Sequence, residues 1–180
     1  MKKLLVVIDY QNDFVSGALG FEGAEKLEPG IIAAVEATVA AGGKVLITRD
    51  THEKDYLETR EGRFLPVPHC VRGTAGHQLY GGLHRYEQAS MPGTMVIDKA
   101  TFGSQTIAEA ARALCGGDPD EITVCGVATD ICVVTNTLIL HTAFLGTAIR
   151  VDRALCGSGN KAGEAAALAL LEGMGIPTGG

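Results

Sequence analysis

The stretch TVCGVATDIC, residues 123–132, contains two cysteines seven positions apart. Cys125 lies inside an apolar run and is expected to pack in the core as a small hydrophobic side chain. Cys132 falls in the first turn of a helix predicted over residues 131–146, with Asp130 as its N-cap. Backbone N–H groups and the positive end of the helix dipole favour a thiolate there. Cys132 is therefore the candidate nucleophile, although its position alone fits a buried, inert cysteine equally well.

Two further residues could support a cysteine nucleophile. Asp9 ends the apolar run LLVVID, and Lys99 ends the run TMVIDK. A nucleophilic thiol needs a group that accepts its proton and a charge that stabilises the resulting anion, which a carboxylate and an ammonium group supply. Either residue alone is more often a solvated surface group. The three residue types together indicate nucleophilic catalysis.

These residues must be positioned by the elements around them. Short apolar or β-branched runs occupy residues 4–9, 44–50, 94–99, 121–127 and 147–152. Such continuous runs predict strands that are buried on both faces. Alanine-rich or apolar stretches predict helices over residues 29–43, 104–117, 131–146 and 161–175. The alternation predicts an α/β fold, a Rossmann-like three-layer sandwich with a mostly parallel sheet and helices on both faces.

Ligands of open α/β sheets bind outside the carboxyl ends of the strands. Asp9, Asp50, Lys99 and the segment after Val127 are therefore expected to meet in one crevice, although the sequence does not give the strand order. Residues 51–94 are rich in Gly, Pro, His and charge and show neither period. A loop of this length inside a compact domain is usually functional.

The length, composition and net charge of the chain indicate what kind of partner it binds. A chain of 180 residues with 46% hydrophobic content predicts one globular domain, residues 1–180. Its 21 acidic and 15 basic residues give a net charge of −6, which argues against nucleic acid or an anionic membrane as a partner. A small-molecule partner is expected instead.

The same properties indicate a location. The apolar run near the start is shorter than the roughly 7–15 residues of a signal peptide, and no run reaches the roughly 18 residues of a membrane span. The five cysteines, an odd number spread over the chain, do not suggest a disulfide framework. We therefore expect a cytoplasmic protein with reduced thiols.

Five motifs carry a resemblance to a known family. VVIDYQNDF, LITRDTH, PVPHC, IDKATFGS and CGVATDICV occur in an order and at spacings that resemble the nicotinamidase and isochorismatase-like cysteine hydrolases. The resemblance implies that Asp9 is the general base and acid, that Lys99 stabilises the charged groups and that Cys132 is the nucleophile. It also implies a cis peptide bond between Val127 and Ala128, so that the N–H groups of Ala128 and Cys132 form an oxyanion hole.

The resemblance further implies a divalent metal beside the triad. Asp50, His52 and His69 match three ligands of the family, and Glu58 is the better match for the fourth ligand, with Glu61 as the second choice. This mixed oxygen and nitrogen set suits Zn²⁺, Mn²⁺ or Fe²⁺. The competing interpretation is that these are ordinary polar loop residues. No organic cofactor is expected, because neither nucleotide-binding glycine motif is present.

The family also suggests substrate contacts and assembly. It lines its pocket with aromatic rings at places similar to Phe14 and Phe64, although aromatic side chains pack cores more often than they hold substrates. Relatives form dimers or tetramers, which implies a homo-oligomer.

The leading hypothesis is an amidohydrolase that cleaves a small amide such as nicotinamide to acid and ammonia through a cysteine thioester. One alternative is a hydrolase of another amide or a ureide such as an N-carbamoyl compound. A second is a metal-free isochorismatase-type hydrolase, against which the presence of Cys132 argues. The non-enzyme alternative is a catalytically silent α/β module that binds a small molecule.

Overall fold

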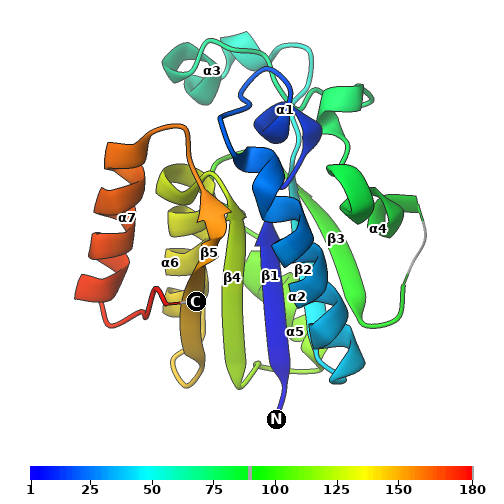
Figure 1. Cartoon of the computed structure of the whole chain (residues 1–180), viewed down its shortest axis with the longest axis vertical. Helices are drawn as coiled ribbons and strands as arrows, with labels where there is room; N and C mark the ends of the chain where they lie inside the picture. Colours follow the sequence, from blue (N-terminus) through cyan, green and yellow to red (C-terminus); the bar gives the residue numbers. More distant parts are fainter. Residues whose placement is uncertain (89–90, 180) are drawn as a thin grey trace.

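Five parallel strands form the sheet that positions the candidate residues (Figure 1). The computed structural model describes residues 1–88 and 91–179. The strands are β1 (Lys3–Ile8), β2 (Lys44–Asp50), β3 (Thr94–Lys99), β4 (Glu121–Val127) and β5 (Ala148–Gly157). They lie in the order β3-β2-β1-β4-β5, which confirms the predicted α/β class. All four strand pairings are parallel.

The apolar runs became strands within one residue of their predicted bounds, except at the end of the last one. Val6, Val7 and Ile8 of the central strand β1 are fully buried, because both faces of the sheet are covered. The fifth strand was expected to end at Asp152, but β5 continues to Gly157. Its register against β4 shifts between Val124 and Gly126, and beyond the shift Cys156 and Gly157 pair with Gly126 and Val127, which extends the strand past Asp152.

Helices cover both faces of the sheet. They are α2 (Glu28–Ala40), α5 (Ile107–Cys115), α6 (Val134–Ala143) and α7 (Lys161–Gly173). Helix α2 lies in front of the sheet in Figure 1, and α5 and α6 lie behind it. Helix α7 packs beside α6. Their ends follow from local chemistry: Gly116 closes α5 in the left-handed conformation at φ 64°, and Asn160 caps α7 by accepting a hydrogen bond from the Gly163 N–H at 3.0 Å.

The helix that carries Cys132 begins earlier than expected. A π-helical turn, η5 (Thr129–Val133), precedes α6, and Ala128 is its N-terminal flanking residue. Asp130 therefore lies inside the first turn and does not cap it, contrary to the sequence-based expectation. Cys132 remains in the first turn, directly beyond the carboxyl end of β4.

The segment between β2 and β3 is built from short helices rather than a structureless loop. They are η2 (Tyr56–Glu58), α3 (Arg60–Phe64), η3 (Ala75–His77), η4 (Gly81–His84) and α4 (Arg85–Gln88). Near the amino terminus, α1 (Asn12–Val15) and η1 (Ala24–Leu27) join β1 to α2. Helices α1 and α3 lie beyond the carboxyl ends of the strands (Figure 1). No helix in the described parts of the chain has the length and hydrophobicity needed to cross a membrane.

The order of the strands locates the crevice. The chain leaves β1 toward β2 and β3 and later returns to place β4 on the other side of β1, so the connections diverge between β1 and β4. Gly126 pairs with Ile8 at this point, with φ at 115°. A Cβ atom at Gly126 would lie 2.1 Å from the Ile8 carbonyl oxygen, so only glycine permits this approach of the two strands.

Candidate active site

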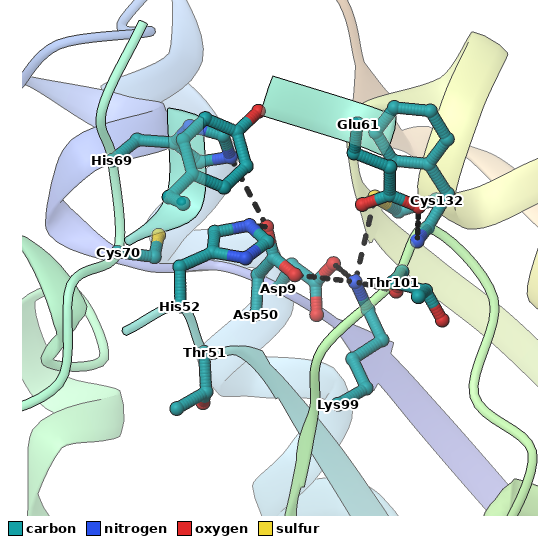
Figure 2. A network of polar contacts seen from close by, with 12 residues as sticks. Asp9, Asp50, Thr51, His52, Glu61, His69, Cys70, Lys99, Thr101 and Cys132 are labelled. Carbon is teal, nitrogen blue, oxygen red and sulfur yellow. Dashed lines mark hydrogen bonds and ion pairs between the residues drawn. The ribbon is translucent and has the colours of Figure 1, made fainter. Parts of the chain in front are cut away.

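Asp9, Lys99 and Cys132 meet beyond the carboxyl ends of three different strands. Lys99 Nζ lies 2.7 Å from Asp9 Oδ2 and 3.6 Å from Cys132 Sγ. It also donates to Asp50 Oδ1 and to the Thr101 carbonyl, each at 3.1 Å. Figure 2 shows this ammonium group at the centre of the cluster. All three side chains are at least 95% buried, so their charges act on one another with little screening by water.

The electrostatics of Asp9 suit a group that both accepts and returns a proton. Burial raises the pKa of Asp9 above the ordinary value, while the ion pair with Lys99 opposes that rise. Thr48 Oγ1 donates a hydrogen bond to Asp9 Oδ1 at 2.6 Å, which fixes the orientation of the carboxylate. Asp9 has a φ of 46°, a conformation that Asp tolerates better than most residues. A carboxyl group with a raised pKa is better matched to proton transfer near neutral pH.

Burial opposes the effect that the helix terminus was expected to have on the Cys132 thiol. Burial raises the pKa of the Cys132 thiol well above the ordinary value, although Lys99 opposes the shift. A charge in a closed site loses its hydration, and this cost acts against the helix terminus. Burial thus favours the thiol over the thiolate, and Lys99 favours the thiolate.

Asp50, His52 and His69 form the second cluster. Their ligand atoms lie within 4.8 Å of one another, and all three residues are buried. Both histidine Nε2 atoms face Asp50 Oδ2, at 2.9 Å for His52 and 3.2 Å for His69. His69 Nδ1 lies 2.7 Å from the Val67 carbonyl oxygen. A carbonyl oxygen can only accept a hydrogen bond, so that contact puts a proton on Nδ1 and leaves Nε2 as the ring atom that faces Asp50. A ring nitrogen that donates to a backbone carbonyl is a common partner arrangement of metal-binding histidines.

The two glutamates considered as a fourth ligand differ sharply. Neither belongs to the cluster of Asp50, His52 and His69, and Glu58 is exposed. Glu61 is buried, and its Oε1 accepts a hydrogen bond from the Phe102 N–H at 2.9 Å. Its Oε2 is buried without a hydrogen-bond partner among the described residues. Glu58, the first choice made from sequence, is thus exposed on η2, whereas Glu61, the second choice, is buried.

A cavity of about 220 Å³ joins the two clusters. Cys132, Ala128, Asp50 and His69 line it, and its apolar wall consists of Phe14, Leu19, Phe21, Leu65, Phe102 and Ile131. Phe14 also packs edge-on against the His69 ring, with centroids 5.4 Å apart. Phe64 does not line the cavity and is 77% exposed, so its expected place is taken by the next residue, Leu65. The direction of a side chain at the end of a five-residue helix could not be read from sequence.

Some cavity residues were missed from sequence. Ser158 and Asn160 line the cavity just after β5. The rule that ligands bind at strand ends would have pointed to them if the end of β5 had been placed correctly. Phe21 and Leu19 lie between α1 and η1, and no pattern in the sequence marks them.

A larger cavity of about 490 Å³ lies at the opposite end of the strands, where they begin. It is formed where β4 and β5 begin and includes His141 and Arg150. It contains no cysteine, and its one carboxylate, Glu121, forms a solvent-exposed ion pair with Lys3. The smaller cavity is the candidate active site, because it alone brings together a thiol, a buried ion pair and a ligand cluster within the described chain.

The Val127–Ala128 peptide bond is cis, as the family resemblance implied. It lies between β4 and the turn that carries Cys132, and Ala128 lines the cavity together with Cys132. Both residues that were expected to form the oxyanion hole therefore border the same space.

Comparison with known proteins places this architecture in a family. The sequence profile of the isochorismatase domain matches residues 3–179. An uncharacterized isochorismatase family protein, PncA of Bacillus subtilis, is 32% identical over 181 residues, which cover 93% of each chain. The crystal structure of nicotinamidase/pyrazinamidase PncA from Bacillus subtilis aligns over the full length of both chains, with a TM-score of 0.87 and 28% identity. Pyrazinamidase of Pyrococcus horikoshii in complex with zinc aligns over 99% of this chain and 98% of its own, with a TM-score of 0.83 and 25% identity. The chain belongs to the isochorismatase family.

Proposed function

We propose that this chain hydrolyses a small-molecule amide to an acid and ammonia, with nicotinamide as the preferred substrate. The observation that carries the proposal is the shared cavity, which has the Cys132 thiol on one side and the ligands Asp50 and His69 on another. A flat aromatic amide that also offers a ring nitrogen matches both sides. The names of the nicotinamidase and pyrazinamidase relatives support the same substrate class.

The first half of the reaction uses the thiol and the carboxylate. Asp9 accepts the Cys132 proton as Sγ attacks the amide carbonyl, so the thiolate never has to exist free in the buried site. The N–H groups of Ala128 and Cys132 stabilise the oxyanion of the tetrahedral intermediate. When the C–N bond breaks, Asp9 returns the proton to the leaving nitrogen, and ammonia departs from a thioester on Cys132.

The second half regenerates the thiol. Asp9 accepts a proton from a water molecule, whose oxygen attacks the thioester carbonyl. The C–S bond then breaks, the acid is released, and the sulfur is protonated again by Asp9. Lys99 keeps its charge throughout, because its carboxylate partners raise its pKa well above the ordinary value against the effect of burial. Its ammonium group balances whichever of Asp9 and Cys132 is negative.

We further propose that Asp50, His52 and His69 hold a divalent ion, with Zn²⁺ preferred and Mn²⁺ or Fe²⁺ as alternatives. Two imidazole nitrogens and one carboxylate are a common ligand set for zinc, and water or substrate can complete the shell. The orientation of the His69 ring fits this role. The partnerless Oε2 of Glu61 makes it the better candidate for a further ligand than Glu58. A bound ion would act as a Lewis acid that anchors the substrate's ring nitrogen.

Initial rates of ammonia release from two amides and one ureide would test the proposal. Protein reloaded with zinc should release ammonia from nicotinamide and pyrazinamide with kcat/KM at least about 10-fold higher than from an N-carbamoyl compound, a ratio equivalent to ~1.4 kcal/mol of transition-state binding. Metal analysis of the same sample should find about one ion per chain. Faster release from the carbamoyl compound, without need for metal, would favour the ureide hydrolase instead.

We propose the cytoplasm as the location of this enzyme and a homo-oligomer of one-domain chains as its assembly. The first is supported by the five cysteines, all of which are free. The second is supported by the family resemblance. Light scattering coupled to size-exclusion chromatography would test it, and a monomer at micromolar concentration would refute it.

A further inference from the structure

The first motif, VVIDYQNDF, contains two polar side chains that the reaction does not use, a buried amide and a half-buried carboxylate. Asp9 is the proposed base, and Phe14 lines the cavity, but Gln11 and Asp13 touch neither the thiol nor the cavity. Gln11 is fully buried. Burying an amide or a carboxylate is costly unless its hydrogen bonds are made. The partners of these two side chains therefore indicate what they are for.

Gln11 forms hydrogen bonds with both backbone polar groups of the proposed ligand Asp50. Its Oε1 accepts a hydrogen bond from the Asp50 N–H at 2.6 Å, and its Nε2 donates to the Asp50 carbonyl oxygen at 2.8 Å. The same Nε2 donates to the His77 carbonyl oxygen at 2.8 Å. A side-chain amide that pairs with both peptide groups of one residue leaves that residue little freedom to shift. Gln11 thus fixes Asp50 where β2 ends.

Asp13 holds the backbone next to the ligand His69. Its Oδ2 accepts a hydrogen bond from the Cys70 N–H at 2.7 Å, which belongs to the peptide group that joins His69 to Cys70. Cys70 has a φ of 45°, a backbone conformation that is uncommon for residues other than Gly, Asn and Asp. The carboxylate packs so closely on Gly76 that a Cβ there would lie 2.1 Å from Oδ2. Asp13 thus fixes a bend in the chain directly after His69.

We propose that Gln11 and Asp13 are positioning residues that align two metal ligands from separate parts of the chain. Asp50 ends a strand and His69 lies in the long segment after it, so neither is oriented by the other's element. One short segment, residues 11–13, holds both and also follows the base Asp9. The inference rests on the proposed metal site. Outer partners that orient ligands typically change metal affinity by about 10–100-fold when they are removed.

Zinc affinity of the full chain would test the proposal, measured by competition with a chromogenic chelator. Gln11→Met keeps the volume of the side chain but removes all three hydrogen bonds, and Asp13→Ala removes the acceptor. Each should raise the zinc Kd by about 10–100-fold. Asp13→Asn retains one acceptor oxygen and should restore most of the affinity. Asn12→Ala is the matched control. Asn12 lies between Gln11 and Asp13, but its Nδ2 donates to the Ala75 carbonyl, which is not next to a metal ligand. Its Kd should stay within about 2-fold of wild type.

Urea unfolding of the metal-free proteins separates positioning from general destabilisation. If Asn12→Ala loses as much metal-free stability as Gln11→Met yet binds zinc normally, the effect on affinity is specific to the ligands. Should Asp13→Ala fail to fold, Gln11→Met and Asp13→Asn still decide the matter. An unchanged Kd in Gln11→Met, with a wild type that binds one zinc, would overturn the inference alone. A wild type that binds no zinc would overturn the proposed metal site and the inference together.

Discussion

At the scale of single residues, Asp9 has the largest number of roles, because it accepts and returns every proton of the proposed cycle. Asp9→Asn should lower kcat by about 10²–10⁴-fold, since an amide cannot accept a proton, with little change in KM. Steady-state kinetics on nicotinamide would measure this, with circular dichroism to verify the fold. Thr48→Val removes the hydrogen bond to Oδ1 and the contact of the Thr48 hydroxyl with the Asp9 N–H but leaves the carboxylate, so it should cost much less. Equal losses in the two variants would contradict the role of Asp9 as base.

The strand-end residues that were predicted to meet share one property. Asp9, Asp50, Lys99 and Cys132 each follow an apolar run, so the strand-end rule brought them together without knowledge of the strand order. Glu58 and Phe64 lie on η2 and α3, where the direction of a side chain depends on how short helices pack. The rise that burial causes in the pKa of the Cys132 thiol also could not be predicted, because burial is a property of the folded site and not of the motif.

At the scale of elements, the contact between β1 and β4 controls where the catalytic groups lie. Gly126→Ala should lower the free energy of unfolding by roughly 2–4 kcal/mol, because the added Cβ would collide with the Ile8 carbonyl and φ is positive. Urea unfolding would measure the change. Gly173→Ala is the control: nothing lies within 4 Å of a Cβ at that position, and it should alter stability by less than about 1 kcal/mol. A similar effect in both variants would show that the close approach of the strands is unimportant.

Elements with strong local patterns were predictable, and those that depend on distant partners were not. The five apolar runs and four helical stretches all appear near their expected places. The end of β5 was missed because its last residues are held by pairing with β4 across a register shift, which has no local signal. The π-helical start of the helix that carries Cys132 was missed for a related reason, since Asp130 looked like a local cap.

At the scale of the whole molecule, a charged network fastens the long segment to the edge of the sheet. Arg49 Nη2 lies 2.7 Å from Asp98 Oδ1, and Arg72 Nη1 lies 3.1 Å from Oδ2. Although partial burial opposes the shift, these two guanidinium groups hold the pKa of Asp98 below its ordinary value. A carboxylate with a lowered pKa stabilises the fold above its unfolded pKa of about 4, and that stabilisation is lost as pH falls through the folded value.

Asp98→Asn should therefore destabilise the protein at pH 7, by about 1 kcal/mol, and much less at pH 3. Urea unfolding of wild type and variant at both pH values would measure the two differences. Asp118→Asn serves as the control, because Asp118 pairs with Arg112 at the surface with 59% of its side chain exposed and should change stability little at either pH. A loss of stability in Asp98→Asn that is larger at pH 3 than at pH 7 would contradict a stabilising role for the ionised carboxylate.

The most direct test of the central claim is ammonia release from nicotinamide by zinc-loaded wild type and by Cys132→Ala, each verified as folded. We expect steady turnover by wild type and background release by the variant, because no other thiol among the described residues lines the cavity beside Lys99. Comparable turnover by both proteins would contradict a covalent mechanism through Cys132.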